Sequence, residues 1–247
     1  MLPTVSGARV LKAKGCIRET FRGPSDWKPL LFDRSKKDTV YSIAQDDGTA
    51  CLRADSDDSA SALVWGREFS PYKYPIVKWR WKVSNVYLKG NIRGKKYNDS
   101  PARLFIMFKY NPEKANFFRK LEYSLARKIY GQYPPASALC YIWASRRHKD
   151  GIRSSPSFGA IKYIVLEAGG KYVGKWREEE INILKDYRRA FGKMPPRTEA
   201  DVAFMDDSDD TGESSTSWLS SLELLTKPSS PVKSQFHNLT VKKVSGP

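Results

Sequence analysis

The chain has 247 residues, 40% of them hydrophobic and 28% charged, which is typical of a folded domain and excludes a disordered or membrane-embedded chain. Its 43 Lys and Arg against 27 Asp and Glu give a formal net charge of +16, which favours an anionic partner. Two His and three Cys exclude multi-histidine metal centres, zinc ribbons and a disulfide framework, and leave His148 as the single candidate for a catalytic triad.

The chain divides into two terminal segments and one main domain. Residues 1–20 form an N-terminal extension that is basic but lacks the apolar core of a signal peptide. Residues 21–225 are the predicted domain. Residues 226–247 are rich in Pro, Ser and Lys without hydrophobic periodicity, which predicts a flexible basic tail. No stretch approaches the roughly 20 apolar residues of a transmembrane helix.

Short β-rich runs separated by turns dominate the domain. In Pro75–Ser84 the hydrophobic residues alternate with polar ones, so Trp79 and Trp81 are expected on a core face. The turn Asp46-Asp47-Gly48 predicts a hairpin between two of the runs. The other predicted strands are Val40–Ala44, Thr49–Ala54, Ser61–Phe69, Ala102–Tyr110, Ala138–Ser145, Ile161–Ala168, Val202–Met205 and Trp218–Leu225. This even spacing predicts an all-β, jelly-roll-like β-sandwich.

Two helices are expected between the strands. After Asn111-Pro112, which is typical of a helix start, hydrophobic residues recur at helical spacing up to Gly131 and predict an inserted amphipathic helix. A short helix is expected over Asn182–Phe191, ended by Gly192.

Five segments stand in a distinctive order: Trp79–Val83, Asn98–Arg103, Tyr141–Trp143, Trp176–Gly192 and Met205–Gly212. In these the chain resembles an uncharacterised, mostly bacterial family catalogued as domain of unknown function 3047, over about Phe32 to Leu225. The resemblance implies a β-sandwich, often exported to the cell envelope or periplasm, and implies no known reaction. Asn98-Asp99 and Ser220-Ser221 depart from the family pattern, which has two acidic residues and Gly-Asp there.

The acidic run Asp206–Glu213 is the candidate metal site. Asp207 and Asp209, which match acidic positions of the family, and the hydroxyl of Thr211 offer oxygen ligands for a structural Ca²⁺. The spacing is not that of an EF-hand, and a solvated loop with an Asx-turn is the alternative interpretation.

Aromatic and basic residues supply the other candidates. Tryptophan rings near loops can stack on sugar rings, although each can also belong to the core. Basic residues crowd two loops, which we call the basic loops: Lys89 to Lys96 and Arg146 to Arg153. A positive field would result if these loops meet. Arg103 is expected to pair with Asp99 or Asp186, as an ion pair that docks the short helix or as a ligand contact. The candidate ligand-binding residues are Trp65, Arg103, Trp143, Trp176, Trp218, Arg146 and Arg147.

Three functions remain open. The first is a non-catalytic binding module for carbohydrate or acidic polysaccharide, with a structural calcium. The second is a structural or interaction protein that docks on nucleic acid or a membrane surface through its basic loops, although no sequence-specific nucleic-acid motif is present. The third is a glycan-active enzyme, for which Glu178-Glu179-Glu180 offers carboxylates that alternate between faces of a strand. No catalytic residue is assigned.

Overall fold

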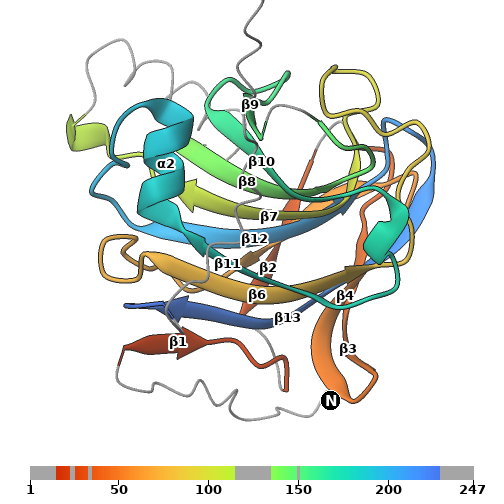
Figure 1. Ribbon diagram of the computed structural model, residues 1–247, viewed down its shortest axis with the longest axis horizontal. Coiled ribbons are helices and arrows are strands. Elements are labelled where there is room, and N and C mark those ends of the chain that lie inside the picture. Colours follow the sequence, from red (N-terminus) through yellow and green to blue (C-terminus); the bar gives the residue numbers. More distant parts are fainter. Residues whose placement is uncertain (1–14, 23–25, 33–34, 115–134, 149–150, 229–247) are drawn as a thin grey trace, which may run out of the picture.

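The computed structural model describes residues 15–22, 26–32, 35–114, 135–148 and 151–228. Two sheets form a mostly β sandwich (Figure 1). Sheet A contains β1 (Cys16–Arg18), β3 (Val40–Asp46), β4 (Thr49–Asp57), β6 (Ile76–Val83), β11 (Arg177–Asn182) and β13 (Ser214–Leu225). Sheet B contains β2 (Trp27–Leu31), β5 (Ala60–Trp65), β7 (Ser100–Phe108), β8 (Ser137–Ala144), β9 (Ile152–Ser154), β10 (Ile161–Ala168) and β12 (Ala200–Asp207). The predicted two-sheet β class is therefore confirmed.

Most neighbouring strands in the two sheets are distant in sequence. The order is β11-β6-β13-β4-β3 in sheet A and β2-β5-β12-β7-β8-β10-β9 in sheet B. Strand β13 lies between β6 and β4 and also pairs with β1. The pair β8–β10 is parallel, and the other pairs are antiparallel. Strand β13, which comes late in the chain, thus joins the pair β11–β6 to the pair β4–β3 in sheet A.

Each of the nine strands expected from the sequence has a counterpart, with ends that differ by a few residues. In the β3–β4 hairpin, Asp46 pairs with Thr49, and the two loop residues Asp47 and Gly48 have φ angles of 49° and 72°. Two consecutive positive φ angles are those of a type I′ turn, which explains the Asp-Gly sequence. Strands β1, β2, β9 and β11 were not expected, and β1 belongs to the segment described above as an N-terminal extension.

The core between the sheets is rich in aromatic rings. Trp79 and Trp81 of β6 are fully buried, as their alternation with polar residues predicts. The ring centre of Trp81 lies 5.9 Å from that of Trp143 in sheet B, and Trp79 lies 5.6 Å from Tyr141. Burial of such side chains contributes roughly 1.5–3 kcal/mol each, so these rings hold the sheets together.

The short helix α2 (Ile183–Phe191) forms where expected. The side chain of Asn182 accepts a hydrogen bond from the backbone of Lys185, and Gly192 ends the helix with a φ of 70°. Figure 1 shows α2 at one end of the sandwich, opposite the end with the β3–β4 hairpin. Of the predicted inserted helix, the structure describes only a 3₁₀ turn, η1 (Pro112–Lys114), and the remaining residues lie outside the described ranges. A second 3₁₀ turn, η2 (Gly170–Tyr172), precedes β11.

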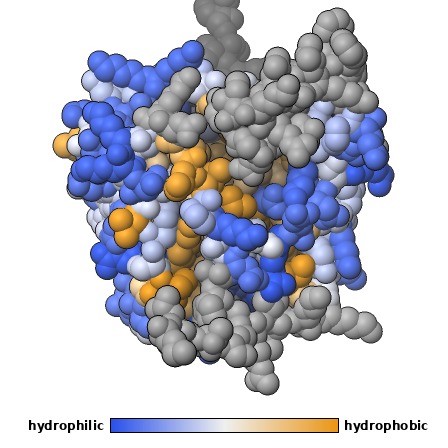
Figure 2. Space-filling view, turned by 180° about the vertical axis from the view of Figure 1, so that it is seen from behind, coloured by the Kyte–Doolittle hydropathy of each residue, from blue (hydrophilic) through white to orange (hydrophobic). Residues whose placement is uncertain are grey.

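One face of the molecule shows how polar and apolar side chains are distributed on it. Seen from behind, hydrophobic side chains gather in the middle of the face and hydrophilic ones flank them (Figure 2). None of the helices in the described part of the chain has the length and apolar character that crossing a membrane requires.

Candidate functional site

The outer face of sheet A carries aromatic and cationic side chains in one row. Trp218 of β13 lies directly opposite Lys82 of β6 and Arg53 of β4. The Lys82 Nζ atom lies 4.5 Å from the centre of the Trp218 ring and 5.5 Å from that of Trp176. Both distances are typical of cation–π contacts. We call Trp176, Lys82 and Trp218 the tryptophan–lysine row.

Asp46, at the end of β3, connects the row to the hairpin. Its Oδ2 atom accepts a hydrogen bond of 2.9 Å from Trp176 Nε1 and forms an ion pair with Lys82 Nζ. The guanidinium of Arg80 lies 5.2 Å from the Trp176 ring centre. Lys82 is buried, whereas both indoles remain partly exposed. The row is therefore fixed in place and still presents ring surface to solvent.

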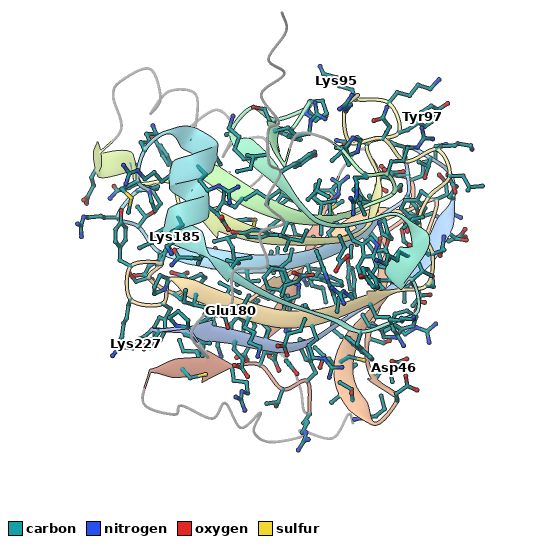
Figure 3. All side chains as sticks on the ribbon, viewed as in Figure 1. Asp46, Lys95, Tyr97, Glu180, Lys185 and Lys227 are labelled. Carbon is teal, nitrogen blue, oxygen red and sulfur yellow. The ribbon has the colours of Figure 1, made fainter. Side chains whose placement is uncertain are left out.

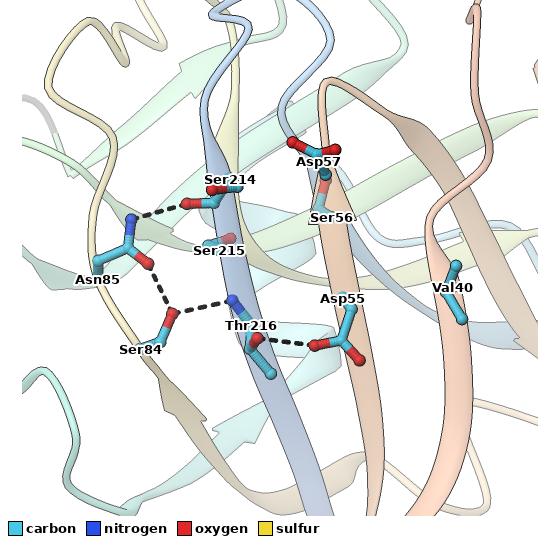
Figure 4. A pocket seen from close by; sticks show the side chains of 9 residues that line it. All are labelled: Val40, Asp55, Ser56, Asp57, Ser84, Asn85, Ser214, Ser215 and Thr216. Carbon is cyan, nitrogen blue, oxygen red and sulfur yellow. Dashed lines mark hydrogen bonds between the residues drawn. The ribbon is translucent and has the colours of Figure 1, made fainter.

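A shallow hollow lies at the start of β13, two residues before Trp218 in the chain (Figure 4). Thr216, two residues earlier on the same face of β13, donates 2.7 Å to Asp55 Oδ1, and Asn85 Nδ2 donates 3.0 Å to the Ser214 carbonyl. The hollow is lined by Val40, Asp55, Ser56, Asp57, Ser84, Asn85, Ser214, Ser215 and Thr216. Hydroxyl, amide and carboxylate groups dominate this lining and can exchange hydrogen bonds with a polar ligand.

Sheet B holds a cluster of carboxylates. Asp99 precedes β7, Asp207 ends β12, and Asp209 follows in the next loop. One carboxylate oxygen from each lies within 4.8 Å of the others. The backbone N–H of Thr211 donates 2.6 Å to Asp99 Oδ2, and the Thr211 hydroxyl donates to the Ser208 carbonyl. We call Asp99, Asp207 and Asp209 the acidic cluster.

Arg103 is buried beside this cluster. Its Nε atom lies 3.1 Å from Asp207 Oδ1, without the alignment of a hydrogen bond, and its Nη2 donates to the Asn98 carbonyl. Burial raises the pKa of the Asp207 carboxyl well above its usual range, and Arg103 opposes this shift. Burial likewise raises the pKa of Asp99 to about 6.

The expected pairing of Arg103 with Asp186 is wrong. Asp186 instead accepts hydrogen bonds from Tyr141, at 3.1 Å, and from Arg189, at 3.2 Å. The reason is geometric, because Tyr141 lies on the core face of sheet B whereas Arg103 lies on its outer face. Sequence alone could not tell on which face the partner of Arg103 lies.

Two of the candidate tryptophans do not reach a surface. Trp65 and Trp143 are fully buried, Trp65 stacked on Trp27 at 6.3 Å and Trp143 against Trp81, so their assignment to a ligand site is corrected. A position near a strand end suggested exposure for Trp65, but it lies in the hydrophobic core beside Trp27 of the neighbouring strand. Trp176 and Trp218 are brought together at the surface.

The basic loops do meet. Arg146 and Arg147 are exposed, and Arg146 Nη2 donates 2.8 Å to the Leu88 carbonyl in the other loop. Figure 3 shows Lys95 of that loop far from Asp46, so the basic loops and the tryptophan–lysine row are separate surfaces. The exposed cations here are Lys89, Arg93, Lys95, Lys96, Arg146 and Arg147. Asp46 was not among the candidate site residues, because its place beside a hairpin turn does not indicate that its carboxylate contacts Trp176 and Lys82.

Comparisons with known proteins give one family and a set of distant structures. Residues 25–223 match the family described as "Protein of unknown function (DUF3047)". No curated protein matches the chain. A family 11 carbohydrate-binding module from Clostridium thermocellum, in complex with a β-1,3-1,4-mixed-linked tetrasaccharide, has a TM-score of 0.43 at 11% identity, covering 87% of this chain and 97% of that one. The Trichoderma harzianum endoglucanase 3 from family GH12 has a TM-score of 0.42 at 11% identity, with 86% and 97% covered.

Proposed function

The chain belongs to the DUF3047 family, and we propose that it is a non-catalytic binding module for carbohydrate, acidic polysaccharides included. The observation that carries this proposal is the tryptophan–lysine row, where two partly exposed indoles share one face with hydrogen-bonding side chains. An indole offers a flat apolar surface on which the C–H face of a sugar ring can pack.

The strand order supports a jelly roll as the scaffold. From β4 to β7 and from β11 to β13 the chain passes between the sheets at each step, and the early strand β4 pairs with the late strand β13. These alternating crossings are those of two Greek keys folded on each other. The outer face of sheet A, which carries the row, is one of the two outward faces of this scaffold.

The hollow at the start of β13 complements the indoles. Sugar hydroxyls need donors and acceptors next to the stacking surface, and Asp55, Thr216 and Asn85 supply both. Arg53 and Arg80, which flank the row, are suited to carboxylate or sulfate groups on an acidic glycan. Stacking and directed hydrogen bonds depend less on ionic strength than charge attraction does.

The test is a titration of the full chain with neutral and acidic glycans at low salt and at about 0.5 M salt. We expect binding that survives salt, and a loss of about tenfold or more in Trp218→Ala and Trp176→Ala, as for aromatic residues at an interface centre. Phe158→Ala is the matched control, because Phe158 is an exposed aromatic residue outside the row. The proposal fails if no glycan binds, or if Phe158→Ala weakens binding equally.

A second function is favoured by the contact between the basic loops. Because Arg146 bonds to the Leu88 carbonyl, cations from both loops form one positive surface that suits a polyanion. With double-stranded DNA as the probe, Arg146→Ala/Arg147→Ala should reduce the slope of log affinity against log salt by about 2, since each phosphate contact contributes about 0.9. An unchanged slope, or no DNA binding, would exclude this surface as the contact.

A further inference from the structure

The acidic cluster carries more negative charge than its surroundings balance. Its three carboxylates face one guanidinium, that of Arg103, so two negative charges are in excess when all the groups are ionised. Asp99 and Asp207 are buried, and water cannot screen their charges as it would on the surface. A site of this kind is stabilised by a positive ion of matching charge.

Buried polar oxygens without a partner accompany the cluster. Three such side-chain oxygens in residues 98–100 have no hydrogen-bond partner among the described residues: Asn98 Oδ1, Asp99 Oδ1 and Ser100 Oγ. Asp99 is the most informative, because it is fully buried and Thr211 occupies only its Oδ2 atom. A buried carboxylate oxygen without a donor is costly and calls for an ion or a bound water.

We propose that Asp99, Asp207 and Asp209 bind one divalent cation, and that Ca²⁺ is the ion that fits best. Oxygens at 2.3–2.6 Å from one Ca²⁺ lie up to about 5 Å apart, which matches the 4.8 Å limit within the cluster. Mg²⁺ demands a near-ideal octahedron and gives up its waters reluctantly, so three carboxylates fixed by the fold suit the more flexible coordination of Ca²⁺ better. Waters complete the six to eight ligands of Ca²⁺.

The positions of the three carboxylates indicate how the ion reaches the site and which segments it holds together. Asp209 is exposed, so the ion enters from solvent on that side. The ion joins the start of β7 to the loop after β12, two segments that are about 100 residues apart in sequence and adjacent in sheet B. This site lies on sheet B and is independent of the glycan surface proposed on sheet A.

Calorimetric titration of the chelator-treated full chain with CaCl₂ or MgCl₂ tests this inference. We expect one saturable Ca²⁺ site, weaker Mg²⁺ binding, and a Tm increase of about 5–10 °C when Ca²⁺ is about 100-fold above its Kd. Asp209→Asn should weaken Ca²⁺ binding by about tenfold or more, because it removes one charged ligand.

Asp210→Asn is the matched control. Asp210 is exposed in the same loop but is not part of the cluster, so its variant should keep the Ca²⁺ affinity within about threefold. Absence of saturable Ca²⁺ binding, or equal losses in both variants, overturns the inference. The Ca²⁺ titrations contain no glycan, so the Ca²⁺ site can be refuted without affecting the glycan proposal, and the reverse also holds.

Discussion

Each sheet buries one cation near its outer face, and the two cations are balanced differently. Lys82 in sheet A is 7% exposed and has one carboxylate, Asp46, together with two indole rings. Arg103 in sheet B is 4% exposed and lies among three carboxylates. The charge on sheet A is thus neutralised locally, whereas sheet B retains excess negative charge. Burial alone therefore does not mark an ion site, because the balance of charge around the buried group decides whether an ion is needed.

The largest effect is expected at Arg103. Arg103→Met should lower the free energy of unfolding by about 3–5 kcal/mol in chelator, because it leaves Asp207 buried without its counter-charge. Urea unfolding at neutral pH measures this. Arg53→Met is the control, since the Arg53–Asp55 pair is substantially exposed and should contribute less than about 1 kcal/mol. Equal losses in the two variants would contradict the view of Arg103 as a buried, unevenly balanced cation.

A smaller effect is expected at Lys82. Lys82→Met should lower the free energy of unfolding by about 1–3 kcal/mol, because the Asp46 side chain remains 19% exposed and still accepts the Trp176 hydrogen bond. The same urea titration is the measurement. A loss as large as that of Arg103→Met would show that the two cations are not balanced differently.

Glu179 of β11, on the core face of sheet A, tests the effect of one partly buried carboxylate away from Lys82. Burial raises the pKa of Glu179 to about 7, with Glu167 adding to the shift, while a hydrogen bond from Trp81 and the charge of Arg177 oppose it. The folded state therefore holds this proton more tightly, and its stability falls as pH rises from about 4.5 to about 7.

Glu179→Gln removes the charge and keeps an acceptor for Trp81. Its free energy of unfolding should exceed that of the wild type by about 1–2 kcal/mol at pH about 8, with little difference near pH 4.5. Chemical unfolding at both pH values checks this. Glu178→Gln, on the outer face of the same strand, should show no such pH dependence. A pH-independent difference for Glu179→Gln would refute the charge argument.

The smallest effect is expected in the hollow of sheet A. Thr216→Val keeps the side-chain shape but removes the hydrogen bond to Asp55, which Arg53 also holds. We expect a loss of about 0.5–1 kcal/mol in unfolding free energy, typical of one partly exposed hydrogen bond. A loss above about 2 kcal/mol would contradict this view, because it would show that Asp55 depends on Thr216 as strongly as a buried charge depends on its partner.

The strands were predictable where hydrophobic alternation is strong, and less so elsewhere. Trp79 and Trp81 alternate with cations, so their core position follows from the period of a strand alone. Strand β11 contains three consecutive glutamates and was missed, because its stability comes from pairing with β6 rather than from its own hydrophobic residues. Local sequence does not contain that partner.

The candidate sites were only partly predictable for the same reason. Asp207 and Asp209 stand together in the sequence, but Asp99 joins them through pairing of β7 with β12. Trp176 and Trp218 are 42 positions apart, and Lys82, which lies between their rings, comes from a third segment. Such groupings depend on sheet register, and a one-residue shift in register would move each side chain to the other face.

The place of β13 in sheet A has a consequence for synthesis on the ribosome. Strands β1, β4 and β6 are synthesised before β13, with which each of them pairs. Their pairing with β13 can form only after residues 214–225 have left the ribosome. Until then one edge of β6 and one edge of β4 lack their partner strand, and unpaired strand edges expose nascent chains to aggregation and to chaperones. Completion of sheet A is therefore a late step of folding rather than a gradual one.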